Sequence, residues 1–108
     1  MPWVVLTLNA TVEKELAALP SDMRARFQQI AGLIREFGLS AMREPLVRHL
    51  RGSLWEIRMR GRDGISRALY VTASRQRVVV VRVFVKKTQK TPAQEIELAL
   101  RRAREIEP

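Results

Sequence analysis

Hydrophobic residues recur with a helical period in the first forty residues of the chain and with a strand period in most of the remainder. Residues 3–8 are apolar and β-branched, and they predict a short strand at the start. Two apolar stripes with helical spacing follow, one on each side of Pro20. They are formed by Val12, Leu16 and Leu19, and then by Met23, Phe27, Ile30, Ile34 and Phe37. We therefore expect an antiparallel pair of helices, with Asn9 or Thr11 capping the first and Ser21 the second.

After Pro45 the apolar positions alternate with polar ones, which is typical of strands that face a core on one side. The predicted strands are 46–50, a short edge strand, and 54–60, 65–72 and 78–85, which form an antiparallel meander. Residues 61–64 and 73–76 provide the turns of this meander. Four consecutive valines at 78–81 indicate a central strand that is covered on both faces.

The segment from Thr91 to Gln94 reads as a capping box with proline at the first helical position, and it predicts a C-terminal helix. Ile96, Leu100 and Ala103 give this helix its apolar face. Together these elements predict a single α+β domain over residues 1–108. Its order is an N-terminal strand, a helix hairpin, an antiparallel meander and a C-terminal helix.

Composition removes several classes of protein. The chain has no cysteine, which excludes disulfides, thiolate nucleophiles and cysteine-based metal sites, and its single histidine argues against a histidine-rich metal centre. No cofactor is expected. The apolar stretches are far too short to span a bilayer, and no signal peptide is evident at the start, so a cytoplasmic protein with no membrane association is expected.

Positive charge is concentrated in one part of the chain. The formal net charge is +9, while residues 1–42 are neutral and residues 64–94 carry seven basic groups and no acidic one. A surface that only keeps a protein soluble intersperses both signs, whereas a surface that binds a polyanion does not. The distribution therefore favours a nucleic-acid partner over a solvated charged face.

The cations of this region fall on adjacent strands of the predicted sheet. Because neighbouring strands lie about 4.8 Å apart, their side chains can converge on one patch. The residues concerned are Arg58, Arg60, Arg67, Arg82, Lys86 and Lys87. Guanidinium groups match the geometry of phosphate, so a surface that binds a nucleic-acid backbone is predicted.

Cleavage of RNA at such a patch would most simply proceed without a metal, because this half of the chain offers only three scattered carboxylates. In that reaction the 2′-hydroxyl attacks its own 3′ phosphate and cations stabilise the developing charge. A base and an acid are also needed. The candidates are His49, Glu56 and a lysine at 86 or 87, with an ordinary surface histidine and a simple ion pair as the competing interpretations.

Three strings of residues resemble the RelE/ParE toxin superfamily, and most closely its phage-derived, HigB-like branch. They are Leu50-Arg51-Gly52-Ser53-Leu54-Trp55-Glu56-Ile57-Arg58, then Arg67-Ala68-Leu69-Tyr70, and then Phe84-Val85-Lys86-Lys87-Thr88-Gln89-Lys90-Thr91-Pro92. The resemblance covers nearly the whole chain, with the elements in the same order. It implies the toxin of a type II toxin–antitoxin pair that acts as an endonuclease on mRNA at the ribosome.

The resemblance also implies site residues and partners. By position it assigns RNA contacts to Arg58, Arg67, Lys86 and Lys87, and His49 is the nearest substitute for a missing acid or base. Phosphate contacts are further expected from Arg51, Arg60, Arg82 and Lys90. The implied partner is a cognate antitoxin of helix-turn-helix type, in a complex that binds operator DNA.

The chain departs from several RNA-cleaving relatives because no tyrosine or histidine follows Lys90. Two alternatives therefore remain open. One is a ParE-like inhibitor of DNA gyrase, and the other is a nucleic-acid-binding relative that does no chemistry.

Overall fold

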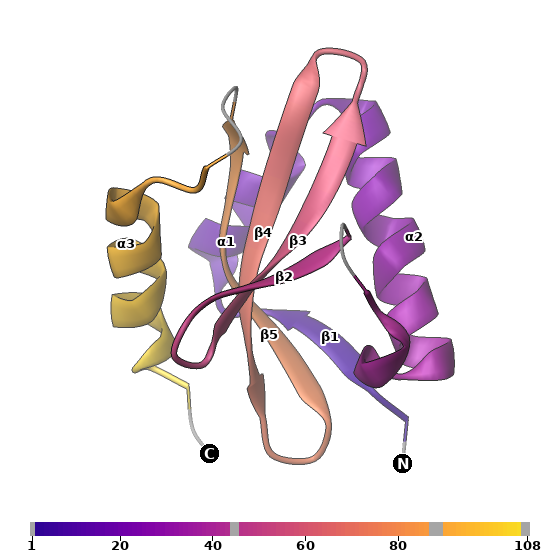
Figure 1. The fold of residues 1–108 in the computed structure, drawn as a ribbon, viewed down its shortest axis with the longest axis vertical. Coiled ribbons are helices and arrows are strands. Elements are labelled where there is room, and N and C mark those ends of the chain that lie inside the picture. Colours follow the sequence, from indigo (N-terminus) through magenta and orange to yellow (C-terminus); the bar gives the residue numbers. More distant parts are fainter. Residues whose placement is uncertain (1, 44–45, 87–89, 107–108) are drawn as a thin grey trace.

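The computed structural model describes residues 2–43, 46–86 and 90–106, and its centre is one five-stranded sheet (Figure 1). The strands are β1 (Val4–Thr7), β2 (Val47–Arg51), β3 (Leu54–Gly61), β4 (Gly64–Ala73) and β5 (Arg77–Lys86). Their order across the sheet is β1-β5-β4-β3-β2. The pairing of β1 with β5 is parallel, and the other three pairings are antiparallel.

Helices cover both faces of the sheet. They are α1 (Ala10–Ala17), α2 (Ser21–Phe37) and α3 (Ala93–Ala103), with a 3-10 turn, η1 (Leu39–Ala41), after α2. Helices α1 and α2 lie on one face, and α3 lies alone on the other (Figure 1). The second face is therefore only partly covered.

Two hydrophobic cores result from this arrangement. The larger core lies under α1 and α2, and the smaller one lies under α3. In β5, Val78 and Val80 enter the larger core while Val79 and Val81 enter the smaller one, because successive side chains of a strand point to opposite faces. The sequence prediction of a central strand with both faces covered is thus confirmed.

Strand β5 contains an irregularity that matters for the site. Leu69 pairs with Arg82 and Tyr70 with Val80, so Val81 is an extra residue. Such a bulge leaves backbone groups without their usual partner on the next strand. Here the Val81 carbonyl accepts a hydrogen bond from Arg102 (2.9 Å), and the Val83 amide donates one to Glu15 (3.0 Å).

The predicted fold class is confirmed: an N-terminal strand, two helices, an antiparallel meander with an edge strand, and a C-terminal helix. Asn9 caps α1 by accepting a hydrogen bond from the Val12 amide (3.0 Å). Two other predicted caps are wrong. Ser21 is the first residue of α2 rather than its cap, and α3 begins after Pro92 without a side-chain cap, because the hydroxyl of Thr91 binds elsewhere.

Candidate active site

A buried ionic cluster lies on the α3 face of the sheet, where three segments distant in sequence meet. Glu56 comes from β3, Arg67 from β4, and Thr91 from the segment that enters α3. Arg58 is paired directly with Arg67 across the two strands. Because side chains alternate along a strand, Glu56 and Arg58 share the face on which Arg67 lies.

Thr91 joins the two charges of this cluster. Its hydroxyl accepts a hydrogen bond from Arg67 Nη1 (2.6 Å) and donates one to Glu56 Oε1 (2.6 Å). Arg67 Nη1 also lies 3.5 Å from Glu56 Oε1. The other carboxylate oxygen, Glu56 Oε2, accepts no hydrogen bond from the described residues, and Arg58 Nε lies 3.9 Å from it.

Burial gives the cluster its electrostatic character. Glu56 is 0% exposed, Arg67 1% and Thr91 6%. Removal from water lowers the pKa of Arg67; Glu56 opposes this shift, and the neighbouring Arg58 and Arg48 add to it. Arg67 is thus a cation that is held away from water beside two others, so a phosphate oxygen brought close to it would be strongly attracted.

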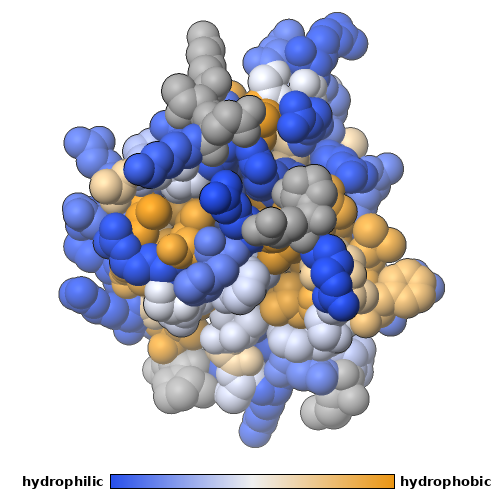
Figure 2. Space-filling view, in the orientation of Figure 1, coloured by the Kyte–Doolittle hydropathy of each residue, from blue (hydrophilic) through white to orange (hydrophobic). Residues whose placement is uncertain are grey.

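A pocket of about 450 Å³ opens beside the cluster. Its wall includes Glu56, Arg67 and Thr91, and the remaining lining residues come from β2, the segment before α3, and α3 itself. These are Arg48, His49, Leu50, Lys90 and Ile96. Figure 2, in the orientation of Figure 1, shows hydrophilic side chains over much of the upper half of the visible surface. The pocket therefore offers an anionic ligand a rim of basic residues. These surround one carboxylate oxygen, Glu56 Oε2, that accepts no hydrogen bond from the described residues.

The structure brings four of the candidate residues from the sequence to this pocket, namely His49, Glu56, Arg67 and Lys90. His49 is exposed at the rim. It is paired with Trp55, its ring meets the Trp55 ring edge-on at 5.0 Å, and its Nε2 shares a hydrogen bond with the Gly52 carbonyl (2.7 Å). These contacts hold the ring in place at the rim of the pocket.

The other predicted cations occupy different places. Arg58 lies between this pocket and the open edge of β3, with Arg60 two residues further along. Lys86 ends β5 opposite Ile65, and Arg51 is exposed at the end of β2. The predicted position Lys87 lies outside the described residues.

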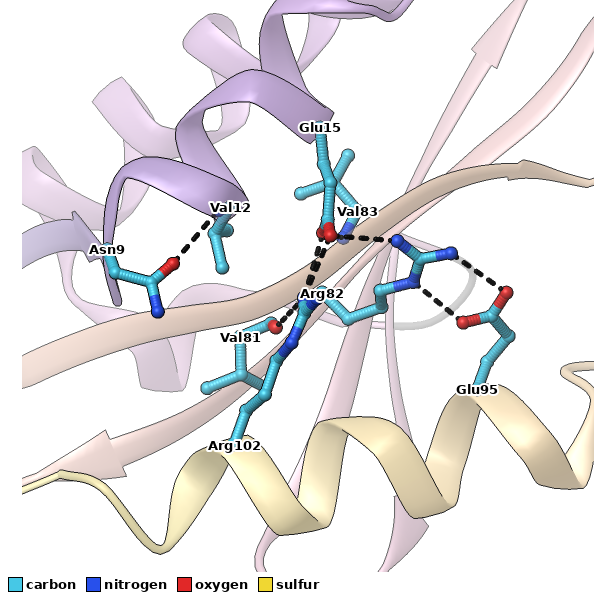
Figure 3. A network of polar contacts seen from close by, with 8 residues as sticks. All are labelled: Asn9, Val12, Glu15, Val81, Arg82, Val83, Glu95 and Arg102. Atoms are coloured by element: carbon cyan, nitrogen blue, oxygen red, sulfur yellow. Dashed lines mark hydrogen bonds and ion pairs between the residues drawn. The ribbon is translucent and has the colours of Figure 1, made fainter.

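Arg82, from which the sequence predicts a phosphate contact, is already engaged by two carboxylates in this structure. Its guanidinium is held by Glu95 of α3 (Nε–Oε1 2.7 Å) and by Glu15 of α1 (Nη1–Oε2 2.9 Å), as Figure 3 shows. The hydrogen bond with Glu95 raises the pKa of Arg82 despite its partial burial. Arg102 approaches Glu15 from the other side (2.9 Å), so the four residues fasten α1 and α3 to the bulge of β5 (Figure 3).

The network corrects one expectation from the sequence. Residues 64–94 contain no acidic group, but the fold places Glu15, Glu56 and Glu95 against their arginines. From the sequence, Glu56 is a candidate base or ion-pair partner, whereas Thr91 is expected only as a helix cap. The pairing of β3 with β4 sets Glu56 near Arg67. Thr91 joins the pair from a segment distant in sequence, so no pattern within the two strands indicates its role.

A metal-binding cluster and a membrane-spanning helix are both absent from residues 2–43, 46–86 and 90–106. Within these ranges no three acidic, histidine or cysteine side chains gather in a way that would hold a metal ion. Within the same ranges, no helix has both the length and the apolar character required to cross a bilayer.

Comparison with solved structures defines the class of fold. The chain is similar to a mutant of the E. coli toxin RelE in the free state, with a TM-score of 0.65 and 21% identity over 94% of this chain and 98% of that one. It is also similar to RelE in the archaeal RelE–RelB complex from Pyrococcus horikoshii, with a TM-score of 0.57 and 22% identity over 79% of this chain and 96% of that one. The protein therefore has the RelE fold, as the resemblance implied.

The family follows from the sequence itself. Residues 14–104 match the family model described as phage-derived protein Gp49-like, and the chain belongs to this family. No curated protein matches the chain. The HigB-like branch remains a prediction.

Proposed function

We propose that the protein is the toxin of a type II toxin–antitoxin pair and that it cleaves mRNA on the ribosome. Three observations support this proposal: the RelE fold, membership of a phage-derived family, and a basic pocket around a buried Glu–Arg pair. The carrying observation is the Glu56–Arg67–Thr91 cluster. It combines a carboxylate oxygen that accepts no hydrogen bond from the described residues with a desolvated guanidinium.

The proposed reaction needs no co-reactant. The 2′-hydroxyl oxygen of the RNA forms a bond to the adjacent phosphorus, and the bond from that phosphorus to the 5′-oxygen of the next nucleotide breaks. The 2′-hydroxyl proton passes to a base, and the departing 5′-oxygen takes up a proton. The products are a 2′,3′-cyclic phosphate and a 5′-hydroxyl end, and negative charge grows on the phosphate in the transition state.

Each residue of the cluster has a role in this proposal. Glu56 Oε2 accepts the 2′-hydroxyl proton, and Arg67 and Arg58 stabilise the phosphate. Because Glu56 and Arg67 are almost fully buried, a phosphate oxygen must replace the Thr91 hydroxyl at Arg67 Nη1 before the reaction. Lys86, Lys87 and Lys90 contribute positive charge, and His49 at the rim is the candidate donor to the leaving oxygen.

The test maps mRNA 5′ ends after induction of the wild type, Glu56→Gln, Arg58→Gln and a control, Arg75→Gln. Arg75 is exposed in the turn between β4 and β5, away from the pocket. Loss of the base is expected to reduce cutting by roughly 100-fold or more, and loss of the Arg58 charge by a similar factor, while the control cuts normally.

Thermal unfolding of the purified variants shows whether each one folds. If the Glu56→Gln and Arg58→Gln proteins fold and still cut mRNA like the wild type, the proposed site is wrong. A wild type that produces no new 5′ ends, with or without ribosomes, would remove the nuclease itself.

The partners are part of the same proposal. One solved protein of this fold is described as a RelE–RelB complex, and this supports a cognate antitoxin for the present chain. We expect that antitoxin to be of helix-turn-helix type, the complex to bind operator DNA, and the toxin to act in the cytoplasm. Rescue of growth by the neighbouring small reading frame would support the pairing.

One observation favours a second function. Glu56 and Arg67 are closed to solvent in this structure, and a binding protein such as a ParE-like gyrase inhibitor would need no access to them. A supercoiling assay with purified DNA gyrase separates the two functions. Inhibition of gyrase without RNA cleavage would favour the inhibitor.

A further inference from the structure

A second basic site lies at the outer edge of β3, separate from the pocket beside Glu56. It is a notch of about 160 Å³. Its lining residues are Arg26, Leu46, Arg58, Arg60 and Ile65. The edge is open here because β2 pairs with β3 only from Leu54 to Ile57, and beyond that point the Leu46 carbonyl accepts a hydrogen bond from the Arg58 amide (2.9 Å).

The three arginines of the notch come from both sides of the sheet. Arg58 and Arg60 are two residues apart on β3, so their side chains share the α3 face at a spacing of roughly 6.6 Å along the strand. Arg26 belongs to α2, which packs on the opposite face, and it reaches the same notch. Its Nη1 donates a hydrogen bond to Gln29 (3.1 Å), one turn further along α2.

None of the five residues that line the notch is acidic, and two carboxylates of the neighbouring elements bind other groups. Glu56 lies 3.9 Å from Arg58, but it also binds Thr91 and Arg67. Asp22, in the first turn of α2, accepts hydrogen bonds from the backbone amides of Arg62 (2.7 Å) and Met23 (2.9 Å). The notch therefore keeps an excess of positive charge.

The chemistry of the notch suits a phosphate group. Guanidinium groups bind phosphate oxygens through paired hydrogen bonds, and three of them converge here from different directions. Leu46 and Ile65 form an apolar part of the wall, and a wall of low polarity strengthens the attraction between the charges.

We propose that this notch binds the phosphate of an RNA nucleotide next to the one held at the Glu56 pocket. The inference rests on the proposed function, and it adds a subsite and a residue, Arg26, that the sequence resemblance does not assign. Arg58 lines the notch, and its Nε lies 3.9 Å from Glu56 Oε2 of the pocket. An RNA strand that follows β3 would thus place consecutive phosphates at the pocket and at the notch.

The test measures binding of a short RNA with a 2′-deoxy nucleotide at the cleavage position, so that no cutting is required. Arg26→Gln is compared with Arg24→Gln, which removes the same charge from an exposed position of α2 outside the notch lining. Arg26→Gln is expected to weaken binding by about 3- to 10-fold and to reduce the slope of log K against log salt by about 0.7, which is the effect of one lost phosphate contact to a single strand.

Two results would overturn the subsite: equal effects of Arg24→Gln and Arg26→Gln, or no binding of the RNA by the wild type. A second experiment separates RNA from free phosphate: inorganic phosphate is titrated into the wild-type protein, and the NMR resonance of Arg26 Nε is followed. A shift with phosphate but none with the RNA would assign the notch to free phosphate and overturn the strand-bound subsite. Failure of the nuclease proposal is a separate result, because it appears as missing 5′ ends rather than as lost binding.

Discussion

The α3 face of the sheet carries two arginine–glutamate clusters that are built in opposite ways. In the Arg82 network each guanidinium meets carboxylates or a carbonyl at 2.7–2.9 Å, and Arg82 keeps 22% of its side chain exposed. In the Glu56–Arg67 cluster both charges are buried, their direct contact is 3.5 Å, and Glu56 Oε2 accepts no hydrogen bond from the described residues.

The difference separates a structural cluster from a reactive one. Well-paired and partly hydrated charges cost little and hold elements together, as the Arg82 network holds α1 and α3. Buried charges with incomplete pairing cost several kcal/mol in desolvation, and proteins retain them where the charge has a use. The Glu56–Arg67 cluster, whose hydrogen bonds are less complete, is therefore the better candidate for chemistry, even though Arg67 is more buried than Arg82.

The largest expected effect comes from breaking the buried pair. Arg67→Ala should destabilise the protein by about 3–5 kcal/mol, because Glu56 is left as a buried and uncompensated charge. The double variant Glu56→Leu/Arg67→Met should recover most of this loss, since both charges are then absent. Chemical denaturation measures both values. A loss below about 1 kcal/mol for Arg67→Ala would show that the pair is hydrated in solution.

A smaller effect is expected when the Arg82 network is opened. Arg82→Ala removes contacts to Glu15 and Glu95 that are partly exposed to water, so a loss of about 1–2 kcal/mol is expected, and it should shrink at high salt. Arg75→Ala is the matched control at an exposed position. If Arg82→Ala cost as much as Arg67→Ala, the contrast between the two clusters would be wrong.

The smallest effect on stability is expected at Asp22, an exposed carboxylate that belongs to neither cluster and therefore serves as a comparison for both. The hydrogen bond from the Arg62 amide lowers the pKa of Asp22 below its ordinary value of 3.8. Its stabilising contribution is therefore present above pH 3.8 and is lost as the pH falls through the lower pKa of the folded state. Asp22→Asn should lower Tm slightly at neutral pH.

That difference in Tm should disappear well below pH 3.8, where Asp22 is protonated in both the folded and the unfolded protein. Thermal unfolding of the two proteins across this pH range is the measurement. A Tm difference that stays constant into strong acid would show that the charge of Asp22 has no part in holding the turn between β3 and β4.

The sequence predicted the helices and strands well because the apolar residues of each element recur with the spacing of a helix or a strand. The alternation of Trp55, Ile57 and Met59 gave β3, and the stripe from Met23 to Ile34 gave α2. What failed depends on segments that are distant in sequence. Thr91 has every local feature of a helix cap, and only the fold shows that its hydroxyl binds Arg67 and Glu56 instead.

The dependence on distant segments also explains why the surroundings of the charged residues on β3 and β5 could not be predicted from the sequence. The polar face of β3 predicts exposed side chains, but α3 and its preceding segment cover Glu56 completely. Arg82 lies in a stretch without acidic residues, yet its partners Glu15 and Glu95 lie far from it in sequence or on the next element. No pattern within a strand carries this information.

The parallel pairing of β1 with β5 also has a consequence for how the protein folds as it is synthesised. Val4 pairs with Arg77 and Thr7 with Val80, so β1 can join the sheet only after β5, the last strand of the sheet in chain order, has been made. Contacts between such distant segments slow folding. On a translating ribosome, the nascent chain would thus complete this sheet only after β5 has been synthesised.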